Sequence, residues 1–129
     1  MEQRILIVDD NTDLASIMSM ILAAEGFSVK VCDNLTSSAI CIEEWSPQLI
    51  VLDVNLNGED GRELCNRLKS DKSSNNIKVI LMSGDETTLE HTELFGADGA
   101  ISKPFDSSDL LEKIQECLQP SLRNTGSKI

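Results

Sequence analysis

Carboxylates, a hydroxyl and an amine stand directly after short apolar runs in this sequence. Asp9 and Asp10 follow one run, Asp53 follows a second, and Ser83 and Lys103 follow two more. If these runs are parallel strands of one sheet, all five side chains lie at the rim where the strands end. An aspartate after a strand is common as a turn or capping residue. Convergence of four separate segments is therefore the stronger sign of a site.

Three carboxylates at one rim require a compensating cation. At about 5 Å each pair repels by roughly 3 kcal/mol at an effective dielectric of about 20. Hard oxygen ligands in a partly open site suit Mg²⁺, which keeps several waters and bridges carboxylates to phosphate oxygens. With a lysine and a hydroxyl beside it, the set predicts phosphoryl transfer. Asp53 is the expected nucleophile, and Asp9 and Asp10 are the expected metal anchors.

The elements that must hold these residues alternate along the chain. Short apolar runs predict strands at residues 5–8, 27–32, 49–52, 77–82 and 99–102. Amphipathic patterns predict five helices. The first has an apolar face over residues 14–22, and the second begins at residue 35 and ends before Pro47. The other three are predicted at 62–69, 86–95 and 106–118. Residues 55–60 are predicted to be a glycine-containing loop.

Five strands alternating with five helices predict an α/β fold, with a parallel five-stranded sheet between two layers of helices. Right-handed crossovers leave few arrangements. One is the flavodoxin-like order 2-1-3-4-5, which places a ligand crevice at the ends of strands 1 and 3. We expect a single domain over residues 1–119. The polar segment 120–129 is expected to be a flexible tail or the stub of a linker.

The composition narrows the possible partners. The chain has 11 basic and 22 acidic residues, a net charge of −11, and 40% hydrophobic residues, which favours a globular domain. This charge repels nucleic acids and anionic membranes, so we expect direct binding to neither; it suits divalent cations or a basic partner. Part of the acidic excess equally suits a surface kept for solubility. The aliphatic runs are far shorter than the ~20 residues that span a bilayer.

The four cysteines have no C-x-x-C spacing, and three of them fall within apolar segments. They are predicted to be buried, reduced thiols that behave as small hydrophobic residues. The only histidine has no cysteine near it at zinc-ligand spacing, so a zinc site is not expected. Together with the absence of an apolar leader before the first strand, this favours a cytoplasmic location.

Over residues 5–118 the chain resembles a receiver domain of the two-component response regulators. The resemblance rests on the strand with its acid pair at 5–10, the strand 49–53, Gly58 with Asp60 and Gly61, Ser83 with Gly84, and Lys-Pro-Phe at 103–105. It implies a signalling switch that receives a phosphoryl group from a histidine kinase or a histidine phosphotransfer protein. An output domain or a downstream protein would then respond.

The resemblance also assigns roles around Asp53, the implied phosphoacceptor. Ser83 and Lys103 would each hold one phosphoryl oxygen in a modification that the domain catalyses on itself. The peptide bond before Pro104 would be cis and would aim the lysine into the pocket.

Further roles concern the metal and the attacking water. Asp10, Asp53 and the backbone carbonyl of Asn55 would bind Mg²⁺, and Asp9 would act mostly through water. Asn55 and Asp85 occupy positions that tune water access to the acyl phosphate. Because both are small and polar, self-dephosphorylation is expected within minutes.

Two residues depart from the family pattern. The family usually has an aromatic residue three positions before the lysine, where its rotamer reports phosphorylation, but this chain has Ala100. Signalling is therefore expected to use movement of residues 83–95. Asn57 replaces a common proline and is expected to loosen its loop without affecting the chemistry.

Three other interpretations are possible. A phosphorylation-independent, receiver-like interaction module is favoured by Ala100. A haloacid-dehalogenase-type phosphohydrolase would need a D-x-D pair on one strand, but Asp53 is followed two residues later by Asn55. A flavodoxin-like electron carrier would need a phosphate loop where Asp9 and Asp10 would repel the phosphate.

Overall fold

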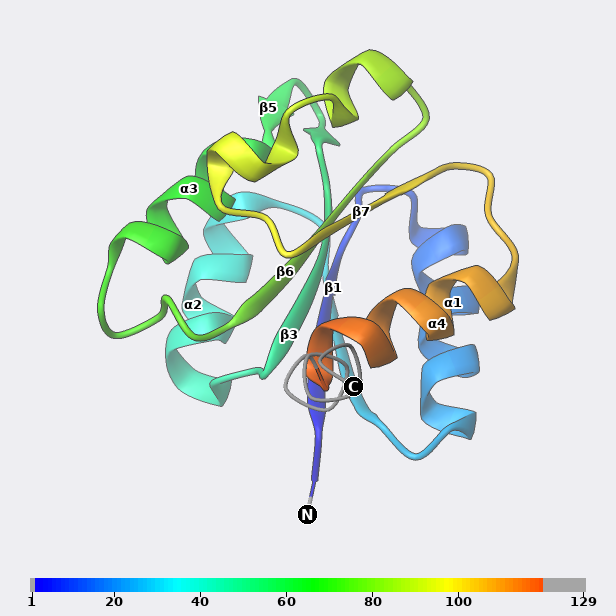
Figure 1. Cartoon of the computed structure of the whole chain (residues 1–129). Coiled ribbons are helices and arrows are strands. Elements are labelled where there is room, and N and C mark those ends of the chain that lie inside the picture. Colours follow the sequence, from blue (N-terminus) through cyan, green and yellow to red (C-terminus); the bar gives the residue numbers. More distant parts are fainter. Residues whose placement is uncertain (1, 120–129) are drawn as a thin grey trace, which may run out of the picture.

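The strands form where the sequence carries uninterrupted aliphatic residues. The computed structural model describes residues 2–119, and five parallel strands in it make one sheet. They are β1 (Arg4–Val8), β2 (Ser28–Cys32), β3 (Leu49–Asp53), β6 (Lys78–Ser83) and β7 (Gly99–Ser102). Their order is β2-β1-β3-β6-β7 (Figure 1), which is the predicted flavodoxin-like order once the two short strands of a separate hairpin are left out of the count.

Helices cover both faces of this sheet (Figure 1). The helices α1 (Thr12–Ala24) and α4 (Ser107–Leu118) lie on one face, and α2 (Leu35–Trp45) and α3 (Gly61–Ser70) lie on the other. Three of these helices have an N-cap side chain that accepts a hydrogen bond from a backbone N–H of the first turn. The N-cap residues are Asn11, Asn34 and Asp60. Such caps stabilise a helix start by about 1 kcal/mol each.

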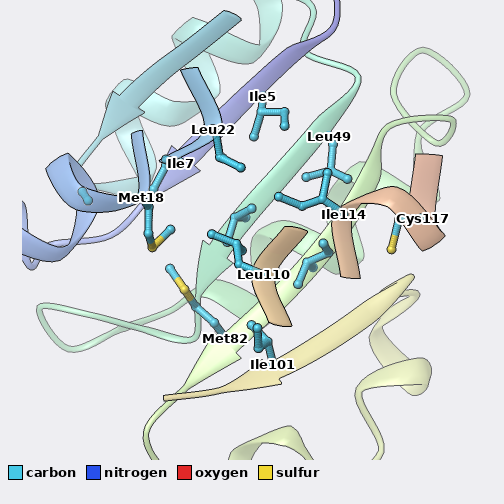
Figure 2. Packing of buried hydrophobic residues seen from close by; sticks show 13 residues of the cluster. Ile5, Ile7, Met18, Leu22, Leu49, Met82, Ile101, Leu110, Ile114 and Cys117 are labelled. Atoms are coloured by element: carbon cyan, nitrogen blue, oxygen red, sulfur yellow. The ribbon is translucent and has the colours of Figure 1, made fainter. Parts of the chain in front are cut away.

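Alternate strand residues enter two separate cores. The core between the sheet and helices α1 and α4 (Figure 2) receives Ile5, Ile7, Leu49, Val51, Ile80 and Met82. The core under α2 and α3 receives Leu6, Val8, Ile50, Leu52, Val79 and Leu81. All twelve are fully buried, and burial stabilises each side chain by about 1.5–3 kcal/mol. The sheet is thus held rigidly from both sides, up to the strand ends.

The fourth predicted helix, at 86–95, is wrong. The segment forms two short 3₁₀ helices, η1 (Glu86–Leu89) and η2 (Thr92–Phe95). Glu90 is extended (φ −69°, ψ 138°) and His91 is left-handed (φ 58°), so the backbone breaks between them. The side chains of Thr87 and Thr88 bond back to Asp85, and such local bonds compete with a regular helix.

A small hairpin replaces the predicted loop at 55–60. Its antiparallel strands are β4 (Asn55–Leu56) and β5 (Glu59–Asp60). Asn57 and Gly58 connect them, both with positive φ (50° and 87°). An Asn-Gly pair favours this tight turn, because asparagine and glycine tolerate the left-handed region best. The hairpin follows β3 directly and therefore borders the acid-bearing end of the sheet.

The thiols are unpaired, as predicted, but not all are buried. Cys65 and Cys117 are buried, whereas Cys32 and Cys41 are half-buried. Burial raises the pKa of Cys65 to about 11, so this thiol is protonated and unreactive at neutral pH. Within residues 2–119, no helix has the length and apolar character needed to cross a membrane.

Gly61 permits the close packing of α3 against the end of β3. Its N–H donates to the Val54 carbonyl at 2.7 Å, and a Cβ at this position would overlap the carbonyl oxygen of Asp53. We expect Gly61→Ala to lower the free energy of unfolding by about 1–3 kcal/mol, as overpacking does. Urea unfolding measures this. Gly84→Ala is the matched control, because its Cβ would meet nothing within 4 Å; equal losses in both variants would contradict the packing argument.

Candidate functional site

The three aspartates named from the sequence come together at the carboxyl end of the sheet. Asp9 follows β1 and Asp53 ends β3. One oxygen from each of Asp9, Asp10 and Asp53 lies within 4.8 Å of the others. Asp9 and Asp53 are buried, and Asp10 is half-buried. Carboxylate oxygens are the hard donors that Mg²⁺ prefers, so the chemistry of this cluster fits that ion.

Lys103 provides the positive charge beside these acids. Its Nζ lies 2.8 Å from Oδ2 of Asp53 and 3.1 Å from Oδ2 of Asp9. Its backbone N–H donates to the carbonyl of Ser83 at 2.8 Å, which ties the segment after β7 to the end of β6. The Lys103–Pro104 peptide bond is cis, as the resemblance implied.

Backbone N–H groups orient the three carboxylates. Those of Asn11, Asn55 and Asn57 donate to Asp9, Asp53 and Asp10, at 2.9, 3.1 and 2.8 Å respectively. The third bond connects the hairpin turn to the acids, because the N–H of Asn57 orients Asp10, one of the three clustered aspartates. That Asn57 leaves the chemistry unaffected stays a prediction. A proline there would have no N–H to donate and could not adopt the positive φ.

Ser83 ends β6, and its side chain is hydrogen-bonded to two residues of the segment that follows. The residue is only 4% exposed. Its Oγ accepts the backbone N–H of Asp85 at 3.0 Å and lies 2.7 Å from Oγ1 of Thr88. Hydrogen bonds from Thr87 lower the pKa of Asp85, which stands exposed at the edge of the pocket.

These side chains surround an open pocket of about 590 Å³, whose lining includes Asp10, Asp53, Asn55, Ser83, Asp85, Thr88 and Lys103. A larger hollow, of about 960 Å³, lies around Arg4, Ser46 and Lys78 and contains none of the three aspartates. Ala100 and Pro104 line a separate shallow hollow. These two predicted site residues therefore lie outside both the lining of the acidic pocket and the aspartate cluster.

Burial and mutual attraction shift the pKa values of Asp53 and Lys103. Burial raises the pKa of Asp53 above the ordinary 3.8, since the hydrogen bond and charge of Lys103 offset the desolvation only in part. For Lys103, burial acts to lower the pKa, but the hydrogen bonds and charges of Asp53 and Asp9 outweigh it, so its pKa is raised. Lys103 is therefore charged at neutral pH. The ionised form of Asp53 lowers the free energy of unfolding, because its charge is buried.

This arrangement predicts how stability depends on pH without divalent cations. A carboxyl whose pKa is raised by folding destabilises the folded state as the pH rises from the unfolded value through the folded one. Asp53→Asn is therefore expected to be more stable than the wild type at pH 7. The difference should shrink as the pH falls towards 3.8, the ordinary pKa of the Asp53 carboxyl. Urea unfolding from about pH 3.5 to about pH 7, a range that spans the ordinary titration of a carboxyl group, measures it.

Asp60 supplies the opposite case as a control. Hydrogen bonds from Arg62 lower the pKa of Asp60, so its charge stabilises the fold above the unfolded pKa, and this stability is lost as the pH falls through the folded pKa. Asp60→Asn keeps a good helix cap and is expected to be less stable than the wild type at pH 7. Changes of the same sign in both variants would contradict the assigned shifts.

Comparison with known proteins agrees with this fold. The family model for the response regulator receiver domain matches residues 5–115. A CheY-like response regulator receiver domain protein from Methanospirillum hungatei is 32% identical, with a TM-score of 0.84, over 96% of this chain and 99% of that one. The receiver domain of NtrX from Brucella abortus is 29% identical, with a TM-score of 0.82, over 89% and 98%.

Among curated relatives, the DNA-binding response regulator MtrA of Mycobacterium tuberculosis is 31% identical over 92% of this chain and 52% of that protein. The chain thus spans about half the length of the curated relatives it matches. It belongs to the response regulator receiver domains, and it is a phosphoacceptor signalling domain of two-component systems with an acidic pocket at the end of its sheet.

Three residues at the pocket were not singled out as functional from the sequence. Asn57 could have been recognised, because Asn-Gly between two short runs indicates a tight hairpin. Arg62 and Thr88, which line the pocket, carry no such signal. Their roles depend on how η1 lies against α3, and no spacing in the sequence indicates that.

Proposed function

We propose that Asp53 is the phosphoacceptor and that the domain catalyses its own phosphorylation from a histidine kinase or phosphotransfer protein. The observation that carries this proposal is the position of the Asp53 carboxylate, which lies within 4.8 Å of oxygens of Asp9 and Asp10 and 2.8 Å from the ammonium of Lys103. An Asp53 oxygen attacks the phosphorus, the bond from phosphorus to the donor histidine nitrogen breaks, and that nitrogen keeps the electron pair.

Asp9, Asp10, Asp53 and the backbone carbonyl of Asn55 would hold Mg²⁺. When bound, the ion neutralises charge on the transferring group. The protein itself supplies the orientation, because backbone N–H groups and Lys103 fix the carboxylates before the donor arrives. Lys103 binds one phosphoryl oxygen by its charge, and the hydroxyl group of Ser83 donates a hydrogen bond to another. Both groups act most strongly where charge develops during transfer.

The partners follow from the family. A kinase or phosphotransfer protein supplies the phosphoryl group, and an output domain or a separate protein responds to it. The relative MtrA is named a DNA-binding response regulator; an output of that kind is one possibility for the protein that carries this domain. The net charge of −11 disfavours DNA binding by the receiver itself. The unpaired thiols suit the reducing conditions of the cytoplasm, which is the proposed location.

Incubation with acetyl phosphate and Mg²⁺ tests the proposal. The intact mass should increase by one phosphoryl group, and EDTA should prevent the increase. The modification should be released by hydroxylamine, which cleaves acyl phosphates and leaves phosphate esters of serine intact. Failure of uptake at every donor concentration would instead favour the phosphorylation-independent interaction module.

The lifetime of the phosphoryl group is expected to be minutes. Asn55 and Asp85 are small, polar and exposed at the pocket, so they leave room for an attacking water. Asp85→Arg, which brings a longer side chain to the pocket edge, is expected to lengthen the lifetime. Loss of the added mass over time, after the donor is removed, measures it. A half-life of many hours in the wild type would contradict this expectation.

A further inference from the structure

The hydroxyl groups of Ser83 and Thr88 form a hydrogen-bonded chain with a fixed direction. Oγ1 of Thr88 lies 2.7 Å from Oγ of Ser83 and 2.7 Å from the carbonyl oxygen of Asp85. A carbonyl oxygen only accepts, so the single hydroxyl proton of Thr88 goes to Asp85. The short contact with Ser83 then requires Ser83 to donate its own proton to Thr88. The Ser83 proton is therefore occupied.

Ser83 needs the same proton to bind a phosphoryl oxygen. Phosphoryl oxygens accept hydrogen bonds, and a hydroxyl has one proton to give. The acceptor side of Ser83 already receives the N–H of Asp85 at 3.0 Å. Ser83 is also buried, so water cannot readily replace a lost partner. It must leave Thr88 in order to reach a phosphoryl group on Asp53.

We propose that Thr88 is the latch of the unphosphorylated state. It holds the Ser83 hydroxyl in place, and a phosphoryl group on Asp53 competes with it for the Ser83 proton. Thr88 acts through Ser83 and touches no reacting atom, so it is a positioning residue. The inference rests on the proposed function of Asp53 and adds to it how the domain registers the modification.

Arg62 connects the latch to the outer segment. Its Nη1 lies 3.5 Å from the carbonyl oxygen of Thr88, and its guanidinium lies 5.3 Å from the ring centroid of Phe95. The same side chain is held by both oxygens of Asp60. When Ser83 releases Thr88, η1 loses the side-chain hydrogen bond that joins it to Ser83. The displacement of η1 is then transmitted through Arg62 to η2. The conformational change can therefore reach the surface even though position 100 carries no aromatic residue.

Affinity for beryllium trifluoride, a non-covalent phosphoryl mimic, tests the latch in the presence of Mg²⁺. Thr88→Val removes the hydroxyl and keeps the side-chain shape, so the mimic no longer competes for the Ser83 proton. The affinity should rise about fivefold, the equivalent of one ordinary hydrogen bond. Thr88→Ser retains the hydroxyl and should bind like the wild type. An NMR titration of the Gly84 and Thr88 amides measures these affinities.

A double-mutant cycle separates the latch from a merely structural role. In a Ser83→Ala background, Thr88→Val should leave the affinity unchanged, because no Ser83 proton remains to be released. Thr88→Ala repeats the comparison with a smaller side chain, in case valine disturbs η1. An unchanged affinity of Thr88→Val, or a gain that persists in Ser83→Ala, would overturn the latch.

The proposed function fails in a different way from the latch. If the wild type binds no beryllium trifluoride and takes up no phosphoryl group, the proposal for Asp53 is wrong. If the wild type does both and the Thr88 variants behave as it does, the function stands and the latch alone is wrong.

Discussion

Asp53→Asn is expected to abolish phosphoryl uptake while the domain stays folded. An asparagine side chain has the shape of aspartate and can still accept a hydrogen bond from Lys103, but its amide oxygen is not a competent nucleophile. Intact mass after incubation with acetyl phosphate and Mg²⁺ should stay at that of the unmodified protein. Because ionised Asp53 destabilises the fold, this variant should also unfold at a higher urea concentration than the wild type at pH 7, so loss of uptake cannot be attributed to unfolding.

Asp13→Asn is the control for this experiment. It removes one carboxylate from the first turn of α1, outside the lining of the pocket, and should leave uptake unchanged. Peptide mapping after borohydride reduction, which converts an acyl phosphate to an alcohol, should place the modification of the wild type at Asp53. A modification mapped to Asp9 or Asp10, or uptake that survives in Asp53→Asn, would contradict the assignment.

Lys103→Met is expected to reduce both the rate of phosphorylation and the stability of the metal-free domain. Removal of a preorganised group that stabilises developing charge lowers a rate by about a hundredfold or more. The same change leaves buried Asp9 and Asp53 without their shared cation. Loss of one partner from a buried ion pair lowers the free energy of unfolding by about 3 kcal/mol. Methionine keeps much of the length of the lysine side chain, so the effect is one of charge.

Mg²⁺ distinguishes the two effects in Lys103→Met. Added Mg²⁺ should restore much of the lost stability, because a cation again offsets the acids, but it should not restore the rate. Lys72→Met, an exposed substitution on the segment after α3, should change neither quantity. If Lys103→Met is phosphorylated as fast as the wild type, Lys103 does not bind the transferring group.

The sequence alone predicts the sheet and the meeting of the acids, because both follow from local signals. Aliphatic runs such as 49–52 are typical of strands buried on both faces of a sheet, that is, of central strands. Once the strands are parallel, their ends must lie at one rim. Asp9, Asp53 and Lys103 are therefore placed together by topology, with no need to know a single side-chain contact.

The segment from Glu86 to Phe95 could not be predicted in the same way. Its apolar residues suggest a helix, but the hydroxyls of Thr87 and Thr88 find nearer partners at Asp85. Which set of hydrogen bonds prevails depends on how η1 packs against Arg62 and β7. These are tertiary contacts, and they override a weak local preference. The hydrogen-bonded pair of Ser83 and Thr88 is hidden from the sequence for the same reason.

The break in the backbone at Glu90 and His91 lowers the free energy needed to open the segment from η1 to η2 locally. A continuous helix over this stretch would have to lose several backbone hydrogen bonds in succession before it could rearrange. Two single 3₁₀ turns joined by an extended residue have few such bonds, so they can move separately at little expense in free energy. Amide hydrogens of η1 and η2 should therefore exchange with solvent well before those of α4. The part of the domain that must respond to Asp53 is then also the part nearest to local unfolding.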